Sequence, residues 1–129
     1  MKIRMTEHSV RLRVGRSELA RFLEVGRIEE TVRFAPAPEA SFTYGLESFA
    51  PGTRTMAVCY RQCGLTVFIT PEQVALWRKE DEVGIYARDD TGTDKALEVI
   101  VEKDFDCLNR NDSQNADAFP NPSQKPVCA

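Results

Sequence analysis

The chain has 129 residues, of which 42% are apolar and 29% charged, and its formal net charge is −3. This length and composition are typical of one globular domain, and the small acidic excess gives no electrostatic reason to expect DNA or RNA as a partner. No apolar run approaches the roughly 20 residues of a membrane-spanning helix, and residues 1–14 lack the apolar region of a signal peptide, so we expect a cytoplasmic protein that does not enter membranes.

Residues 1–50 are predicted to form strand, strand, helix, strand and strand in that order. Apolar and charged residues alternate in VRLRV, residues 10–14, as in a half-buried strand. The helix is expected to begin after Gly15, with Glu18 in its first turn, and to end at Gly26, because glycine tolerates the left-handed conformation that often follows a helix.

Residues 56–105 are predicted to repeat this order. LTVFI, residues 65–69, again alternates as a strand, and Cys-Gly before it suits a tight hairpin turn. Thr70 is a predicted helix cap, Pro71 suits the first helical position, and Gln73 completes a capping box.

An offset of 55 positions aligns the two halves without gaps. It matches Val10, Leu12 and Val14 with Leu65, Val67 and Ile69, Phe22 with Trp77, and Ile28 with Val83. Apolar residues meet apolar residues throughout, although few residues are identical. This pattern predicts an internal duplication, and a chance likeness between two β-rich halves is the alternative.

The sequence therefore predicts an α+β fold of eight strands and two helices, with a mainly antiparallel sheet. We expect a single domain, with one copy at about 1–50, a second at about 56–105 and an added tail at 106–129. The sheet is expected either to close into a barrel, which would remove its edges, or to stay open with both helices on one face. Because the two copies would supply internal symmetry, we expect a monomer, with a homodimer as the alternative.

The four cysteines are expected to be free thiols or metal ligands rather than disulfide partners in a reducing cytoplasm. Cys59 and Cys63 would lie about 13 Å apart in an extended strand, which is too far for one zinc ion. Cys107 and Cys128 could approach each other if the tail folds back, as thiols, a disulfide or half of a zinc site. His8, at a predicted hairpin turn, is a further candidate ligand.

The tail is polar over residues 109–117 but apolar after that. Its apolar residues are Phe119, Pro120, Pro122 and Val127. They could hold the tail against the body of the domain.

Charged residues alternate with apolar ones in several predicted strands. The candidate binding residues among them are Arg4, Arg11, Arg13, Glu98 and Glu102. One interpretation is an ordinary sheet with its apolar side inward and its charges in solvent. The other is a wide barrel whose charged lumen grips phosphates and a divalent metal, which is similar to the triphosphate tunnel enzymes. The first strand of those enzymes carries an E-x-E-x-K motif, whereas this chain has KIRMT, without glutamate.

The chain contains the stretches SVRLRV, DEVGI and VEKDFDCL, the last followed by DAFPNP and Cys128. These stretches, and above all the last group, resemble a family of small bacterial proteins of unknown function. The resemblance covers most of the chain and implies a bacterial cytoplasmic origin. It also implies that Cys107 and Cys128 belong to the family pattern and that Cys59 and Cys63 do not.

No common catalytic motif occurs, and a nucleophile paired with histidine would have to use His8. The leading hypothesis is a noncatalytic domain that binds a small molecule or a protein and needs no cofactor. The alternatives are a thiol or zinc site built from Cys107 and Cys128, and a barrel phosphohydrolase that uses the arginines and glutamates.

Overall fold

A computed structural model describes residues 1–48, 56–105 and 116–120. Within these residues the chain forms eight strands and two helices. In chain order they are β1 (Lys2–Thr6), β2 (Ser9–Val14), α1 (Arg16–Val25), β3 (Arg27–Arg33), β4 (Ser41–Ser48), β5 (Ala57–Arg61), β6 (Gly64–Ile69), α2 (Pro71–Trp77), β7 (Gly84–Asp89) and β8 (Leu97–Lys103). The predicted element order and the α+β class are confirmed.

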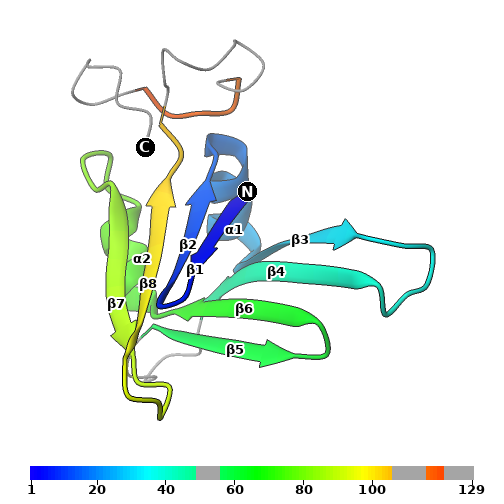
Figure 1. Cartoon of the computed structure of the whole chain (residues 1–129). Helices are drawn as coiled ribbons and strands as arrows, with labels where there is room; N and C mark the ends of the chain where they lie inside the picture. The colour runs from blue at the N-terminus through cyan, green and yellow to red at the C-terminus, as the bar shows by residue number, and fades with distance from the viewer. Residues whose placement is uncertain (49–55, 106–115, 121–129) are drawn as a thin grey trace.

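The strands form two separate four-stranded sheets (Figure 1). Sheet A has the order β1-β2-β8-β7, and sheet B has the order β3-β4-β6-β5. Each sheet therefore combines one hairpin from the first half of the chain with one from the second. The hairpins themselves are antiparallel, but they join through the parallel pairs β2–β8 and β4–β6.

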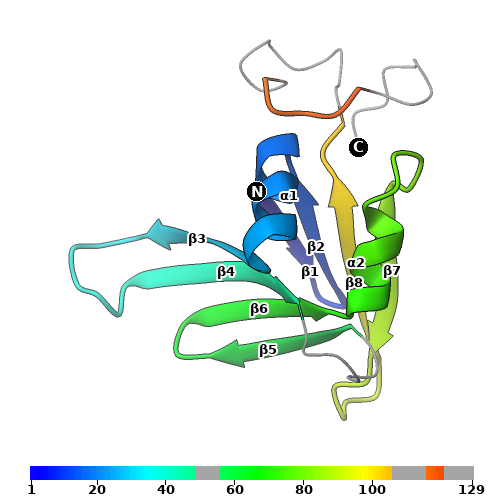
Figure 2. The same ribbon diagram turned by 180° about the vertical axis from the view of Figure 1, so that it is seen from behind.

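The predicted alternative of a closed barrel is wrong for the part of the chain that the structure describes, because each sheet keeps two edge strands. The sheets are mixed, but each contains two antiparallel pairs and one parallel pair, so they are mainly antiparallel, as predicted. Both helices lie on one face of sheet A, behind it in Figure 1 and in front of it in Figure 2. Among residues 1–48, 56–105 and 116–120, no helix covers the opposite face of sheet A.

The predicted capping signals form as local hydrogen bonds. Thr70 Oγ1 accepts a hydrogen bond from Gln73 N at 3.1 Å, and Gln73 Oε1 accepts one from Thr70 N at 2.9 Å. Gly26 ends α1 with a φ of 78°. In the β5–β6 turn the positive φ values belong to Gln62 and Cys63, while Gly64 already begins the next strand, so the turn lies one residue earlier than predicted.

One apolar core joins the inner faces of both sheets to the helices. Phe22 of α1 and Trp77 of α2 meet edge to face at its centre, with ring centroids 6.3 Å apart, and both side chains are almost fully buried. Such aromatic pairs contribute about 0.5–1.5 kcal/mol beyond their buried area. The two helices are therefore held to each other as well as to the sheets.

The geometry of the two halves corresponds closely but not without a gap. The bounds of β1 and β2 reappear 55 positions later as those of β5 and β6, and the parallel pair Ser9–Glu98 corresponds to Gly64–Thr43. The third strand departs from this offset. Ile28 pairs with Leu46, and in the second half it is Ile85, not Val83, that pairs with Val101. The connection between α2 and β7 is longer than that between α1 and β3, so the gapless alignment is wrong at this point.

Replacement of Trp77 by alanine should destabilise the whole domain, because it opens a large cavity where the helices meet. We expect the free energy of unfolding, measured by urea titration, to fall by about 3–5 kcal/mol. The matched control is Leu76→Ala on the same helix, whose side chain is 52% exposed and should change stability by less than about 0.5 kcal/mol. Equal losses in both variants would contradict the central role of the aromatic pair.

Candidate functional site

The face of sheet A opposite the helices is built from alternate residues of all four strands. The strand registers arrange these residues in three rows across the sheet, which are Lys2–Arg13–Glu102–Gly84, Arg4–Arg11–Ile100–Tyr86 and Thr6–Ser9–Glu98–Arg88. We call this surface the open face. It brings together all five of the predicted binding residues, but on an exposed sheet surface rather than in the lumen of a barrel.

Two arginines of β2 share one carboxylate on β8. Arg13 Nε donates a hydrogen bond to Glu102 Oε1 at 3.0 Å, and Arg11 Nε lies 3.5 Å from the same oxygen. The three side chains are only partly exposed, at 21% for Arg13, 29% for Arg11 and 15% for Glu102. Packing therefore limits the movement of both guanidinium groups.

Gly84 leaves space for the backbone of Val101 and for the first side-chain carbon of Glu102. A Cβ atom at Gly84 would lie 2.8 Å from the carbonyl oxygen of Val101 and 2.9 Å from the Cβ of Glu102. Because one of these neighbours is backbone, the clash could not be relieved by a side-chain rotation. A side chain at this position would displace Glu102 and with it the partner of Arg11 and Arg13.

Basic residues stand directly opposite one another on β1 and β2. Lys2 pairs in register with Arg13, and Arg4 pairs with Arg11. Lys2 Nζ also donates a hydrogen bond to Asp104 Oδ2 at 2.7 Å, whereas within the described residues no ion pair involves Arg4. Like charges directly opposite each other destabilise a sheet, so an anion bound between them would relieve an unfavourable arrangement.

Where β7 and β8 meet on the open face there is a hollow that the sequence did not predict. It has a volume of about 280 Å³ and is lined on this face by Tyr86, Ile100, Arg88 and Glu98. Tyr86 is 62% exposed, and Arg88 lies 3.7 Å from Glu98. The alternation in GIYARD could have placed Tyr86 and Arg88 on one face, but only the register of β7 with β8 shows which residues they join.

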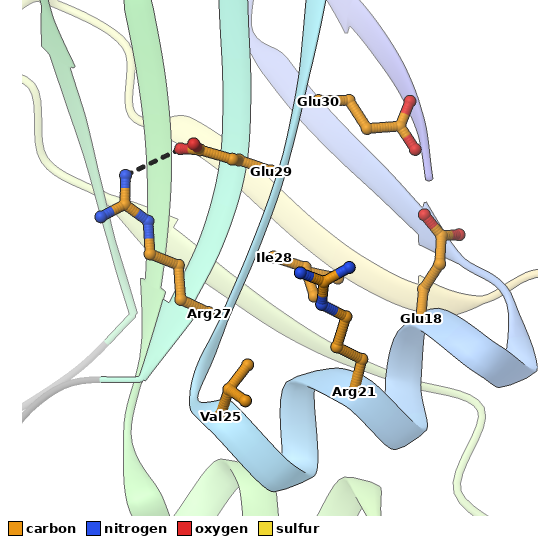
Figure 3. A pocket seen from close by; sticks show the side chains of 7 residues that line it. All are labelled: Glu18, Arg21, Val25, Arg27, Ile28, Glu29 and Glu30. Atoms are coloured by element: carbon orange, nitrogen blue, oxygen red, sulfur yellow. Dashed lines mark hydrogen bonds and ion pairs between the residues drawn. The ribbon is translucent and has the colours of Figure 1, made fainter.

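A second charged region surrounds the α-amino group of Met1 between α1 and β3. Glu18 and Glu30 both accept hydrogen bonds from this amine, the latter at 2.7 Å. Tyr44 donates to the carbonyl oxygen of Met1 at 3.0 Å and lies 3.2 Å from Glu30. Figure 3 shows the carboxylates of Glu18 and Glu30 pointing toward each other, while Arg27 turns away to Glu29.

Two hollows of about 510 Å³ and 340 Å³ share Glu18 and Glu30 in their lining, and Met1 lines the smaller one. Burial opposes the charge on the amine, but the hydrogen bonds with Glu18 and Glu30 outweigh it and raise the pKa of the amine above 8.0. Burial likewise opposes the charge on Glu30, yet the bond from the amine lowers its pKa below 4.5. Burial and the nearby charge of Glu30 raise the pKa of Tyr44 to about 12.

Part of the tail packs back onto the body, as predicted for Phe119. The amide of Phe119 donates to the carbonyl oxygen of Asp104 at 2.6 Å, and its ring packs against that of Phe105. Asp117 accepts hydrogen bonds from Ser17 N and Ser17 Oγ at the start of α1. Pro122 and Val127 lie outside the described residues.

A buried lysine lies beside this returning segment. Lys103 Nζ donates to the carbonyl oxygen of Lys79 at 2.7 Å after α2 and lies 5.6 Å from the centre of the Phe119 ring. Burial lowers the pKa of Lys103, although the carboxylate of Asp81 acts against this shift. Both neighbours of the ammonium group favour a positive charge, so Lys103 ties the end of α2 to the tail.

The predicted thiol or zinc site lies mostly outside the described residues, since Cys107 and Cys128 are not among them. Of its three candidates only His8 is described, and it lies 3.5 Å from Glu7 at the β1–β2 turn. Cys59 is half-buried and Cys63 exposed, and both are free thiols. Within residues 1–48, 56–105 and 116–120 no group of three or more side chains is placed to hold a metal ion. The tail-cysteine site therefore stays a hypothesis.

The profile of a family of unknown function, DUF7009, matches residues 1–123. The chain belongs to this family. The predicted resemblance to a family of unknown function is thus confirmed, while the bacterial origin stays a prediction. No curated protein and no solved structure matches the chain, and no helix in its described part is long and apolar enough to cross a membrane.

The cluster around Met1 predicts a two-sided dependence of stability on pH. The raised pKa of the amine means that its contribution is complete below pH 8.0 and is lost as the pH rises through that raised value. The lowered pKa of Glu30 means that its contribution is present above pH 4.5 and is lost as the pH falls through that lowered value.

The variant Glu30→Gln should therefore flatten both limbs of a plot of urea midpoint against pH, measured on chains with a free Met1 amine. The effect on the alkaline side should be partial, because Glu18 still holds the amine. Glu24→Gln, an exposed position on α1, is the control and should follow the wild type. A Glu30→Gln curve parallel to that of the wild type would show that Glu30 contributes nothing to the pH dependence.

Proposed function

We propose that the protein is a noncatalytic binding domain whose open face takes an anionic small molecule. The observation that carries this proposal is two pairs of facing basic residues, Lys2–Arg13 and Arg4–Arg11, on a sheet surface that no helix of the described residues covers. The strands would be more stable with neutral or opposite charges there. An anion bound between β1 and β2 would be attracted by the basic residues of both strands.

The arginines suit phosphate or carboxylate groups, because a planar guanidinium can donate two parallel hydrogen bonds to such a group. Arg11 and Arg13 are held from one side by Glu102, which reduces the entropy that they lose when an anion binds. Arg4, on the edge strand β1, is exposed and adds a charge that can close over the ligand. The site therefore combines two arginines that Glu102 holds in place with a third, Arg4, whose side chain can change conformation when the ligand binds.

Binding is proposed in preference to catalysis because of the position of the acidic residues. A phosphohydrolase of the tunnel type needs several carboxylates and a lumen to hold a metal beside the phosphates. On the open face Glu102 is engaged by two arginines and Glu98 lies beside Arg88. This arrangement supports a surface that holds an anion without activating it.

We also propose that the fold arose by internal duplication. The shared bounds of β1–β2 and β5–β6 and the matching registers of the two parallel pairs support this origin. The cytoplasmic location and the monomeric state stay predictions.

The proposal is tested with pyrophosphate as the probe, by calorimetric titration at low salt. Each charge-assisted hydrogen bond that is lost should cost about 1.5–3 kcal/mol, so Arg4→Gln/Arg11→Gln, which removes two, should weaken binding by roughly a hundredfold or more. The matched control is Arg33→Gln/Arg61→Gln, which removes two exposed arginines from the strands of sheet B. If both double variants weaken binding equally, the effect comes from the overall charge of the protein and not from the open face. If the wild type shows no detectable binding of pyrophosphate, the proposal is wrong.

A further inference from the structure

We infer that the anionic ligand of the open face is a nucleotide with at least two phosphates, whose base lies against Tyr86 and whose phosphates lie between β1 and β2. This inference rests on the proposed anion site and adds the chemical class of its ligand. It is carried by the middle row of the open face, Arg4–Arg11–Ile100–Tyr86. That row contains two cations at one end and an aromatic ring beside an aliphatic side chain at the other.

At the aromatic end of the row, the Tyr86 ring can stack on one planar ring of a ligand. The side chain of Tyr86 is 62% exposed, whereas that of the preceding residue, Ile85, points to the other face of the sheet and is buried. The hollow beside it, about 280 Å³ in volume, lies just below the range of about 300–1,000 Å³ for small-molecule pockets, which suits a ligand that is only partly enclosed. Exposed aromatic side chains on open sheets bind bases by stacking, and the neighbouring Ile100 extends the apolar surface.

The spacing between the two ends suits one nucleotide. Neighbouring strands are about 4.8 Å apart, so Tyr86 on β7 and Arg11 on β2 are separated by roughly 10 Å across β8. A sugar bridges part of this distance, and the length of an arginine side chain bridges the rest. The second phosphate would then reach the side of Arg4, one strand further on.

The charges around the hollow also favour a base over a second anion. Glu98 and Arg88 lie together on its rim, so this end carries one charge of each sign, whereas the β1–β2 end carries an excess of positive charge. A ligand with a neutral ring at one end and negative charge at the other matches this distribution. A compact anion such as pyrophosphate would use only the basic end.

The test compares four probes with the wild-type protein in a chelating buffer: ADP, pyrophosphate, adenosine and a single-stranded oligonucleotide. We expect ADP to bind about tenfold more tightly than pyrophosphate, since stacking of one base has that order of effect, and adenosine to bind most weakly. The variant Tyr86→Leu should bring the affinity for ADP down to that for pyrophosphate and leave pyrophosphate binding unchanged. The control is Tyr60→Leu on β5 of sheet B, because Tyr60 is equally exposed at 66% and lies on the other sheet.

The outcomes separate this inference from the proposed function. If pyrophosphate binds and ADP binds no tighter, the anion site stands and the nucleotide inference is wrong. If Tyr86→Leu and Tyr60→Leu change the affinity for ADP equally, the base does not stack on Tyr86 and the inference is likewise wrong. If a single-stranded oligonucleotide binds more than tenfold tighter than ADP, the ligand is a polymer and not a nucleotide. If no probe binds, the proposed function itself fails.

Discussion

The parallel pairing of β2 with β8 and of β4 with β6 is the constraint on which the rest of the structure depends. A single two-stranded hairpin is at best marginally stable in water. Each half of the chain supplies two hairpins, and each hairpin completes its sheet only with a hairpin of the other half. Neither half can therefore bury its apolar surface alone. The pairing of hairpins from the two halves also brings α1 and α2 together, and this allows Phe22 to contact Trp77 in the core.

The same exchange determines the composition of the open face. The β2–β8 pairing places Arg13 beside Glu102, and Glu102 in turn needs the missing side chain of Gly84 on β7. The positive charge of the first hairpin is thus only partly compensated by the second. The proposed anion and nucleotide sites both use the positive charge of this hairpin. The architecture and the proposed chemistry therefore have one cause.

The start of the chain and the returning tail segment meet near the carboxyl ends of β2 and β8. Lys2 bonds to Asp104, Asp117 bonds to the start of α1, and Phe119 packs on Phe105. In this arrangement the predicted family signature around DFDCL and DAFPNP has a structural role for at least its Asp104, Asp117 and Phe119. These contacts connect α1, sheet A and the tail without using the residues of the open face beyond Lys2.

The amino-acid sequence by itself determined the features that depend on near neighbours. Alternation over five residues identified β2 and β6, and Thr70 with Gln73 located the start of α2. The sharing of one face by Arg4, Arg11 and Arg13 is also a local matter within one hairpin. Only the tertiary structure decided that the strands form two open sheets, that Glu102 reaches both arginines, and that Tyr86 lies in their row. Those facts depend on register between strands distant in sequence, and register is set by the packing of the whole core, which no local pattern encodes.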